Sequence, residues 1–336
     1  MRKTAFGVVA ALLLTGSVGF AQTKHSETGN AIVKEATENS QLEVLAHELL
    51  DGIGPRLVGT PKMLQANDWA VAKFKSWGVE ARNEKYGEWR SWERGITHVD
   101  MVAPWTKSLQ GMQLAWSPST KGKTVNGETI ILPDLADSAA FQAWLPNAKG
   151  KFVLISMHQP TGRPDYNWKE FGTEESQEKM RKLKAETQQA WAKRLSKTGL
   201  NARNLALALE NAGAAGLIQS NWSQAFGANK IFGANTKKIP TIDLSLEDYG
   251  LVYRLTESGQ KPKLNVRADS KDLGMAPTFN TIAEIRGSEK PDEYIVLSAH
   301  FDSWDGATGA TDNGTGTIVM MEALRILKKI YPNPKR

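Results

Sequence analysis

The sequence predicts an α/β protein in which a mostly parallel sheet, flanked by helices, is interrupted by a second unit inserted into it. Segments with strand periodicity and segments with helix periodicity alternate from about residue 37 onward. Residues 294–299 form an apolar run without polar alternation, which is typical of a strand buried on both faces of a parallel sheet. The length of 336 residues exceeds what one hydrophobic core usually organises, so two domains are expected.

The amino terminus has the pattern of a secretory signal peptide. Arg2 and Lys3 supply the positive charge, residues 5–20 are apolar or small, and Ala21 precedes a cleavage point. A membrane anchor is the alternative, but roughly 16 weakly apolar residues fall short of the roughly 20 that are needed to span a bilayer. We therefore expect a signal peptide at residues 1–21, export to the periplasm or the exterior, and no stable membrane anchor after cleavage.

Composition restricts the chemistry. The chain has no cysteine, which excludes disulfides, thiolate metal ligands and a cysteine nucleophile, so a metal would have to be held by histidines and carboxylates. The 42 Lys and Arg residues are interspersed with 36 Asp and Glu residues and leave a formal net charge of +6. Such mixing indicates a solvated surface rather than a basic stripe, and we expect no nucleic-acid partner.

The first unit is expected to begin after a polar, flexible leader at residues 22–36, and its first part is assigned to residues 37–110. Residues 54–61 form a turn-rich loop in which Thr60 can cap a helix and Pro61 can occupy the first turn of that helix. After this helix the sequence predicts two strands, at residues 79–86 and 97–103.

Residues 111–272 have a second pattern of their own and are predicted to form the inserted unit. Both signs of charge at helical spacing make residues 174–197 an exposed helix. A linker is expected at residues 269–276, where the pattern ends. The other expected strands and helices of this unit lie at residues 128–132, 136–144, 151–157, 202–211, 217–219, 239–244, 246–257 and 263–267.

The first pattern resumes at residues 273–336. Its expected elements are strands at residues 280–285 and 293–299 and a helix at residues 313–331. Pro332 and Pro334 forbid continuation of that helix, so the last residues should form a loop that leads into a strand outside this chain. We therefore expect the chain to be the front part of a longer protein.

Three side chains that could hold metal follow the predicted strand at residues 294–299. His300 stands at the carboxyl end of that strand, where open α/β sheets place their ligands. Asp302 can accept the other ring N–H of His300 and fix its tautomer. Asp312 follows a glycine-rich loop and begins the next helix, where its two oxygens could bridge two cations about 3.5 to 4 Å apart. This predicts half of a two-metal hydrolase site, because the 24 residues after Asp312 contain no His or Asp.

Each of these residues also has an ordinary interpretation. A single histidine at a strand end is more often packed or solvated than a ligand, and an aspartate before a helix is often only a cap. Asp302 and Asp305 could make local bonds to the loop backbone. Glu322, in the helix that follows, is expected to be structural or exposed. The other histidines, each interpreted as an ordinary residue, are His25, His47, His98 and His158.

Residues 300–316 resemble the first metal-binding segment of metallopeptidase family twenty-eight, the two-zinc aminopeptidases, and most closely that of its carboxypeptidase Q-like subgroup. The loop at residues 54–61 is similar to an early motif of the same subgroup. Residues 205–218 resemble the protease-associated (PA) domain, which the subgroup carries as an insertion. The resemblance implies a zinc-exopeptidase-like sheet, incomplete here, that is interrupted by a PA domain at residues 111–272.

The resemblance also implies roles for individual residues. His300 would ligate one zinc, Asp302 would serve catalysis by orienting His300, and Asp312 would bridge both zincs. Asn313 stands where the subgroup often has a second aspartate. The family's glutamate pair, which supplies the general base, and its further aspartate and histidine have no counterpart after Asp312.

We therefore expect an exported exopeptidase that hydrolyses short peptides, as an aminopeptidase or a dipeptidase-like carboxypeptidase, with a water activated by two Zn²⁺ ions. This chain by itself is expected to be inactive, since the general base and most ligands are missing from it. Another two-metal amidohydrolase, such as a deacylase, and a non-catalytic binding protein of the same architecture are the alternatives.

Overall fold

The computed structural model describes residues 26–224, 227–228 and 233–336. The predicted signal peptide at residues 1–21 and His25 lie outside the described residues. In the described part of the chain, no helix combines the length and the apolar character that crossing a membrane requires.

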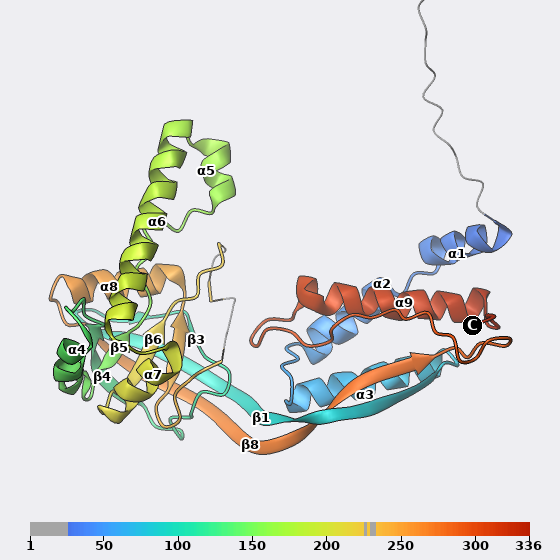
Figure 1. Ribbon diagram of the computed structural model, residues 1–336, viewed down its shortest axis with the longest axis horizontal. Helices are drawn as coiled ribbons and strands as arrows, with labels where there is room; N and C mark the ends of the chain where they lie inside the picture. Colours follow the sequence, from blue (N-terminus) through green and yellow to red (C-terminus); the bar gives the residue numbers. More distant parts are fainter. Residues whose placement is uncertain (1–25, 225–226, 229–232) are drawn as a thin grey trace, which may run out of the picture.

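A long two-stranded ribbon runs through the molecule and joins its two ends (Figure 1). It consists of β1, Glu80–Ala103, and β8, Lys263–Glu284, which pair in antiparallel fashion along their whole length. The pairing extends from Ala103 opposite Lys263 at one end to Glu80 opposite Glu284 at the other. These strands belong to a sheet that has eight strands within the described residues, in the order β2-β1-β8-β4-β5-β6-β7-β3.

One end of the ribbon carries a compact α/β unit with a parallel core. Strands β4, β5, β6 and β7 pair in parallel, while β3 adds an antiparallel edge and β4 joins β8. Helices cover the sheet because each βαβ connection places its helix on one face. The elements are β2 (Lys107–Ser108), β3 (Gly111–Gln113), β4 (Val125–Ile131), α4 (Ser138–Trp144), β5 (Phe152–Leu154), α5 (Asp165–Phe171), α6 (Glu174–Lys197), α7 (Ala202–Asn211), β6 (Gly216–Gln219), β7 (Thr241–Leu244) and α8 (Leu246–Glu257).

The other end of the ribbon is covered by helices from both ends of the described chain (Figure 1). The side chain of Thr60 accepts a hydrogen bond from the Met63 amide at 3.2 Å and so caps the helix at the ribbon, as predicted. The helical elements are α1 (Glu27–Glu38), α2 (Leu42–Ala46), a π-helical segment (His47–Ile53), α3 (Pro61–Ser76), a second π-helical segment (Ala310–Gly314) and α9 (Thr315–Ile330).

Separate hydrophobic cores lie at the two ends of the ribbon. The first is built around side chains of the parallel strands, such as Phe152, Leu154 and Ile218, each fully buried. The second brings Leu45 and Leu49 from the amino-terminal helices against Ile318 of α9. The mixed α/β class is therefore confirmed, although parallel pairing in the described sheet is confined to the unit at the first core. The exact domain boundaries stay a prediction.

The prediction of a strand at residues 293–299 is wrong. This segment has no strand pairing, and Tyr294, Ile295 and Val296 are 69%, 75% and 78% exposed. A strand needs neighbours for its backbone N–H and C=O groups, and the described residues supply none beside this segment. Apolar composition thus identified a segment that could form a buried strand, but not its partner.

Two further expectations are wrong for reasons of tertiary contact. The flexible leader expected at residues 22–36 is helical in its described part, because α1 is capped by Ser26 and its Glu35 is buried in ion pairs against α9. The linker expected at residues 269–276 is instead part of β8, since β1 offers it a continuous line of pairing partners. For the same reason the strands expected at residues 79–86 and 97–103 are one strand.

Candidate metal centre

His300 lies between two carboxylates. Its Nδ1 is 3.1 Å from Oδ1 of Asp302, and its Nε2 is 3.0 Å from Oδ1 of Asp312. The loop that carries Asp302 and the π-helical segment before α9 that carries Asp312 therefore meet at one imidazole. All three predicted site residues are brought together, and their side chains are half-exposed or more.

Neighbouring polar groups hold this arrangement in place. The backbone carbonyl of His300 accepts hydrogen bonds from Asn313 Nδ2 and from Thr317 Oγ1, each at 3.3 Å. The second carboxylate oxygen of Asp312 accepts a hydrogen bond from Trp304 Nε1 at 3.2 Å. Asn313 thus links the segment before α9 to the backbone of His300.

The start of α9 can approach this loop closely because residue 314 is glycine. A Cβ at Gly314 would collide with the side chain of Leu50 and lie 2.8 Å from the carbonyl oxygen of Gly309. Both contacts are shorter than real Cβ atoms show, so a larger residue would push the helix start away. The position of Asp312 therefore depends on this glycine.

Arg56 fixes the loop of residues 301–309, called here the metal-site loop. Its side chain is completely buried and its guanidinium donates hydrogen bonds to the carbonyl oxygens of Phe301 (3.1 Å), Gly54 (2.8 Å) and Thr308 (2.8 Å). The Arg56 amide also donates to Ser303 Oγ at 2.9 Å, and its carbonyl accepts from the Ser303 amide at 3.1 Å. Burial lowers the pKa of Arg56, while the charge of Asp302 acts in the opposite direction.

Sequence reasoning identified the loop at residues 54–61 but not the role of Arg56. The available signal was a single basic residue placed between Gly-Pro and Leu-Val-Gly, in a segment that is otherwise apolar or turn-forming. A charged residue in such surroundings has to find partners if it is buried. What the sequence could not show is that the partners lie some 250 positions away.

Asp305 is buried as well, and its partner is distant in the sequence. Its carboxylate accepts a hydrogen bond from Arg94 Nε at 3.1 Å and makes a second, very short contact with Arg94 Nη2. Because Arg94 belongs to β1, this pair joins the metal-site loop to the middle of the ribbon. Asp305, for which local bonds to the loop backbone were the ordinary interpretation, is thus paired with a distant side chain.

The donor set suits zinc in kind but is small. A neutral imidazole and a carboxylate are ligands that zinc prefers, and His300 Nε2 and Asp312 face the same point. Asp302 faces the other ring nitrogen, so it can orient the imidazole but not share the same ion. Within residues 26–224, 227–228 and 233–336, no three His, Asp or Glu side chains are grouped to hold a metal ion.

The remaining described histidines and Glu322 do not add to the site. His47 pairs with Asp51 at 2.9 Å on the surface, and His98 lies within β1. Glu322 is 5% exposed and paired with Arg325, so of the two expected alternatives, structural or exposed, the structural one holds. His158 lies in the α/β unit at the other end of the ribbon.

Parts of this chain are similar to known proteins. The model of the peptidase family M28 matches residues 280–336, the segment that contains His300 and Asp312. Carboxypeptidase Q of Rattus norvegicus is 26% identical over 292 residues, which cover 86% of this chain and 54% of the relative. Carboxypeptidase Q of Homo sapiens is 26% identical over 307 residues, 91% of this chain and 58% of the relative. The chain thus spans a little over half the length of these curated relatives.

Solved structures share the fold. A peptidase M28 precursor from Shewanella amazonensis superposes with a TM-score of 0.62 at 22% identity, over 92% of this chain and 65% of that one. A zinc aminopeptidase from Bacillus subtilis gives a TM-score of 0.51 at 18% identity, over 85% and 57%. The fold is therefore one that these peptidase structures share. The chain is thus similar to peptidase family M28 in the sequence of residues 280–336, and to a solved peptidase M28 precursor in the fold of most of its length.

Proposed function

We propose that this chain is part of an exported, zinc-dependent exopeptidase that hydrolyses peptide bonds of short peptides. The observation that carries the proposal is the placement of His300 between Asp302 and Asp312 in the segment that matches the family. Relatives and neighbours named carboxypeptidase Q and zinc aminopeptidase support peptide hydrolysis with zinc. Their names include both carboxypeptidases and aminopeptidases, so either end of a short peptide is a possible point of cleavage.

Each residue has a chemical role in this proposal. Asp302 accepts the Nδ1–H of His300, which leaves the lone pair of Nε2 free for a metal. Asp312 supplies a second donor and, through its other oxygen, could serve a second zinc, because an oxygen that accepts from Trp304 keeps another lone pair. Zinc, when bound there, would polarise the scissile carbonyl as a Lewis acid.

The described residues by themselves should hydrolyse peptides poorly or not at all. The imidazole of His300 and the carboxylate of Asp312 provide two ligands. Catalytic zinc sites usually have three protein ligands. No glutamate is placed beside His300 in the described part that could act as general base. We therefore expect binding of zinc without appreciable turnover by this chain alone.

The test measures zinc binding by the chain without its predicted signal peptide. His300→Ala and Asp312→Asn should each weaken zinc binding in isothermal titration by about tenfold or more, because each removes one of two donors. His47→Ala is the matched control, since His47 also pairs with an aspartate but lies on the surface of a helix. Equal zinc affinity of the three variants and the parent chain would contradict the assignment of the site.

Two other parts of the proposal need tests of their own. Export predicts that the protein recovered from outside the cytoplasm begins at Gln22, which amino-terminal sequencing can determine.

For residues 111–272, we propose a PA-type insertion, supported by the parallel α/β unit with its own core at one end of the ribbon. Expression of this segment as a stable, folded domain would support that proposal, and an unfolded product would count against it.

A further inference from the structure

A small pocket is lined by residues of α6 and α8. These helices belong to the α/β unit at the end of the ribbon away from α9 (Figure 1). The pocket opens between α6 and α8, beside the loop that follows β5, and has a volume of about 190 Å³. This is below the range of about 300–1,000 Å³ that is typical of drug-sized ligands. The pocket is therefore the right size for one side chain with its head group.

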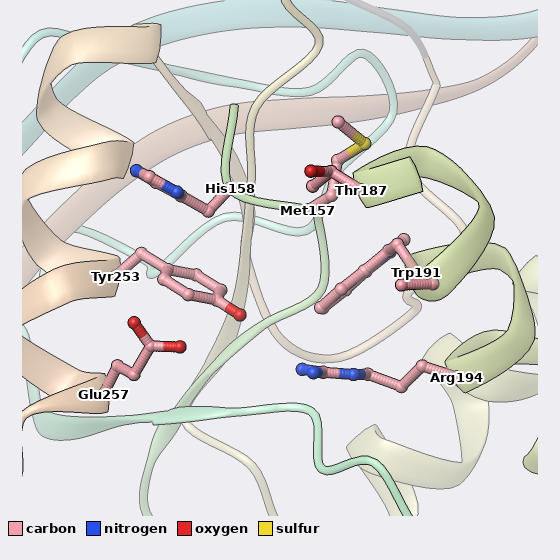
Figure 2. A pocket seen from close by; sticks show the side chains of 8 residues that line it. Met157, His158, Thr187, Trp191, Arg194, Tyr253 and Glu257 are labelled. Atoms are coloured by element: carbon pink, nitrogen blue, oxygen red, sulfur yellow. The ribbon is translucent and has the colours of Figure 1, made fainter. Parts of the chain in front are cut away.

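Aromatic rings form two opposite walls of this pocket (Figure 2). On the α8 side, the ring of His158 stacks on Tyr253 with centroids 5.4 Å apart and planes inclined by 22°. On the α6 side, Trp191 is 9% exposed and carries the guanidinium of Arg194 over its ring at 4.7 Å. A flat or branched apolar group fits between such walls, because it removes aromatic surface from water on both sides.

Opposite charges face the same space. Figure 2 shows the guanidinium of Arg194 on the α6 side and the carboxylate of Glu257 on the α8 side, both directed toward the opening between the rings. Arg194 donates to the carbonyl oxygen of Leu132 at 3.1 Å, but its buried Nε has no hydrogen-bond partner among the described residues. A guanidinium has five N–H donors, so the part of it that lines the pocket offers donors to an anion in addition to the bond to Leu132, whereas the buried Nε does not.

The imidazole of His158 adds no charge to the pocket. Burial, together with the nearby charge of Arg254, lowers the pKa of His158, and Arg254 Nη1 lies 3.4 Å from His158 Nε2 as a donor. His158 is then a neutral ring with its Nε2 accepting. The pocket thus combines apolar walls with one cationic and one anionic end.

We propose that this pocket binds an apolar α-amino acid, either free or as the carboxyl-terminal residue of a short peptide. The α-carboxylate would accept from Arg194, the side chain would lie between Trp191 and Tyr253, and the ammonium or the peptide N–H would face Glu257. This site is separate from the metal centre and does not depend on it. An exopeptidase would thereby carry a second position that recognises the kind of molecule its reaction consumes or releases.

The test uses titration calorimetry with the chain without its predicted signal peptide and four probes. L-leucine carries both charged groups, L-leucinamide lacks the carboxylate, N-acetyl-L-leucine lacks the ammonium, and glycyl-L-leucine presents leucine as a carboxyl-terminal residue. We expect leucine to bind and leucinamide to bind about tenfold more weakly or worse, because a charge-assisted bond to Arg194 is lost. The ratio of glycyl-leucine to leucine affinity distinguishes a peptide end from a free amino acid.

Variants separate this site from its surroundings. Arg194→Met should weaken leucine binding by about tenfold or more, while Lys193→Met, which removes the same charge from an exposed neighbour on α6, should not. Glu257→Gln should weaken binding of leucine but not of N-acetyl-leucine. His300→Ala should leave leucine binding unchanged, which distinguishes this pocket from the metal centre.

Three results would overturn the proposal. One is the absence of saturable binding of leucine and glycyl-leucine at concentrations up to about 10 mM, the weak end of specific recognition. Another is equal binding by Arg194→Met and Lys193→Met, with circular dichroism showing that both are folded. The third is loss of binding in His300→Ala, which would move the amino acid to the metal centre.

Discussion

At the scale of single residues, the position of the metal-site loop depends on Arg56. One planar guanidinium donates to three carbonyl oxygens that belong to two segments far apart in the sequence. Carbonyl oxygens in a loop have no ladder or helix to satisfy them, so a buried donor with several N–H groups can fix them all at once. Lysine, with one nitrogen, cannot reproduce this geometry.

Arg56→Lys is therefore predicted to be a damaging substitution. It should lower the free energy of unfolding by about 2–4 kcal/mol, because buried carbonyl groups lose their partners. Zinc affinity should fall by about tenfold or more, as for other groups that orient ligands. Urea unfolding and zinc titration check both effects, with the exposed Arg82→Lys as the control. Equal stability of the two variants would show that water replaces the guanidinium at no cost.

A second residue, Asp243, is predicted to make stability depend on pH. It is 1% exposed, and burial raises its pKa from 3.8 to about 7, although the Asn221 amide donates to it at 2.8 Å. Between these pH values the folded state holds a proton that the unfolded state has lost. Proton binding by the folded state means that the free energy of unfolding falls as pH rises from about 4 to about 7.

Asp243→Asn should remove this contribution. The variant is expected to match the parent near pH 4 and to be more stable at pH 8, by at most about 4 kcal/mol, since each pKa unit corresponds to about 1.4 kcal/mol. Urea unfolding across this pH range measures the difference. Asp292→Asn, at an exposed position, is the control. A parent chain whose stability rises over the same interval, with no change in the variant, would refute the assignment.

At the scale of elements, local sequence determined helices α6, α7 and α8 and could not determine the pairing of residues 293–299. Helices α6, α7 and α8 have the predicted bounds because Thr173, Asn201 and Ser245 each accept a backbone N–H at the helix start. Such caps are visible in the sequence. A strand depends on which other segment lies beside it, and this information is not local.

The contact between α1 and α9 shows that the partners of buried charged residues are likewise not apparent from local sequence. Arg325 donates to Glu35 at 2.6 Å and to Glu322 at 2.7 Å, and all three side chains are buried. The hydrogen bond from Lys329 and that from Arg325 lower the pKa of Glu35 to about 2. Sequence reasoning assigned residues 22–36 to a polar leader because it could not see that Glu35 has a buried partner 290 positions later.

Arg325→Met is predicted to release α1 from α9. Removing the partner of the buried Glu322 should cost about 3–5 kcal/mol of unfolding free energy, whereas Lys329→Met, which removes an exposed cation, should cost less than about 1 kcal/mol. Since the depressed pKa of Glu35 stabilises the fold above the unfolded value of 4.5, stability of the parent should fall as the pH is lowered toward 2. Hydrogen exchange of α1 and acid titration measure the two effects. Unchanged protection of α1 in Arg325→Met would argue against this role.

At the scale of the whole molecule, the β1–β8 ribbon connects the two hydrophobic cores. The metal centre belongs to one core, and the pocket at Trp191 and Tyr253 belongs to the other. Side chains of the ribbon contribute to both, with Ala81 in one core and Val99 in the other. Composition and length predicted two units, but the continuous ribbon that connects them was not apparent, because a linker and two short strands were expected in its place.

Thermal unfolding is therefore predicted to occur in two steps. Saturating zinc should raise the transition of the core around Leu45 and Ile318 by a few degrees and leave the other transition in place. Differential scanning calorimetry with and without zinc, combined with hydrogen exchange to assign each step, tests this. A single transition that shifts as a whole would mean that the ribbon couples both cores into one cooperative unit.

The ribbon also has a consequence for the order of events during synthesis. Its strands are separated by roughly 160 residues, and at about 5–20 residues per second the first strand leaves the ribosome many seconds before its mate. Closing so long a loop by chance is slow, but the intervening unit can fold first and bring Ala103 next to Lys263. The remaining pairs can then form one after another, from this end of the ribbon toward Glu80 and Glu284.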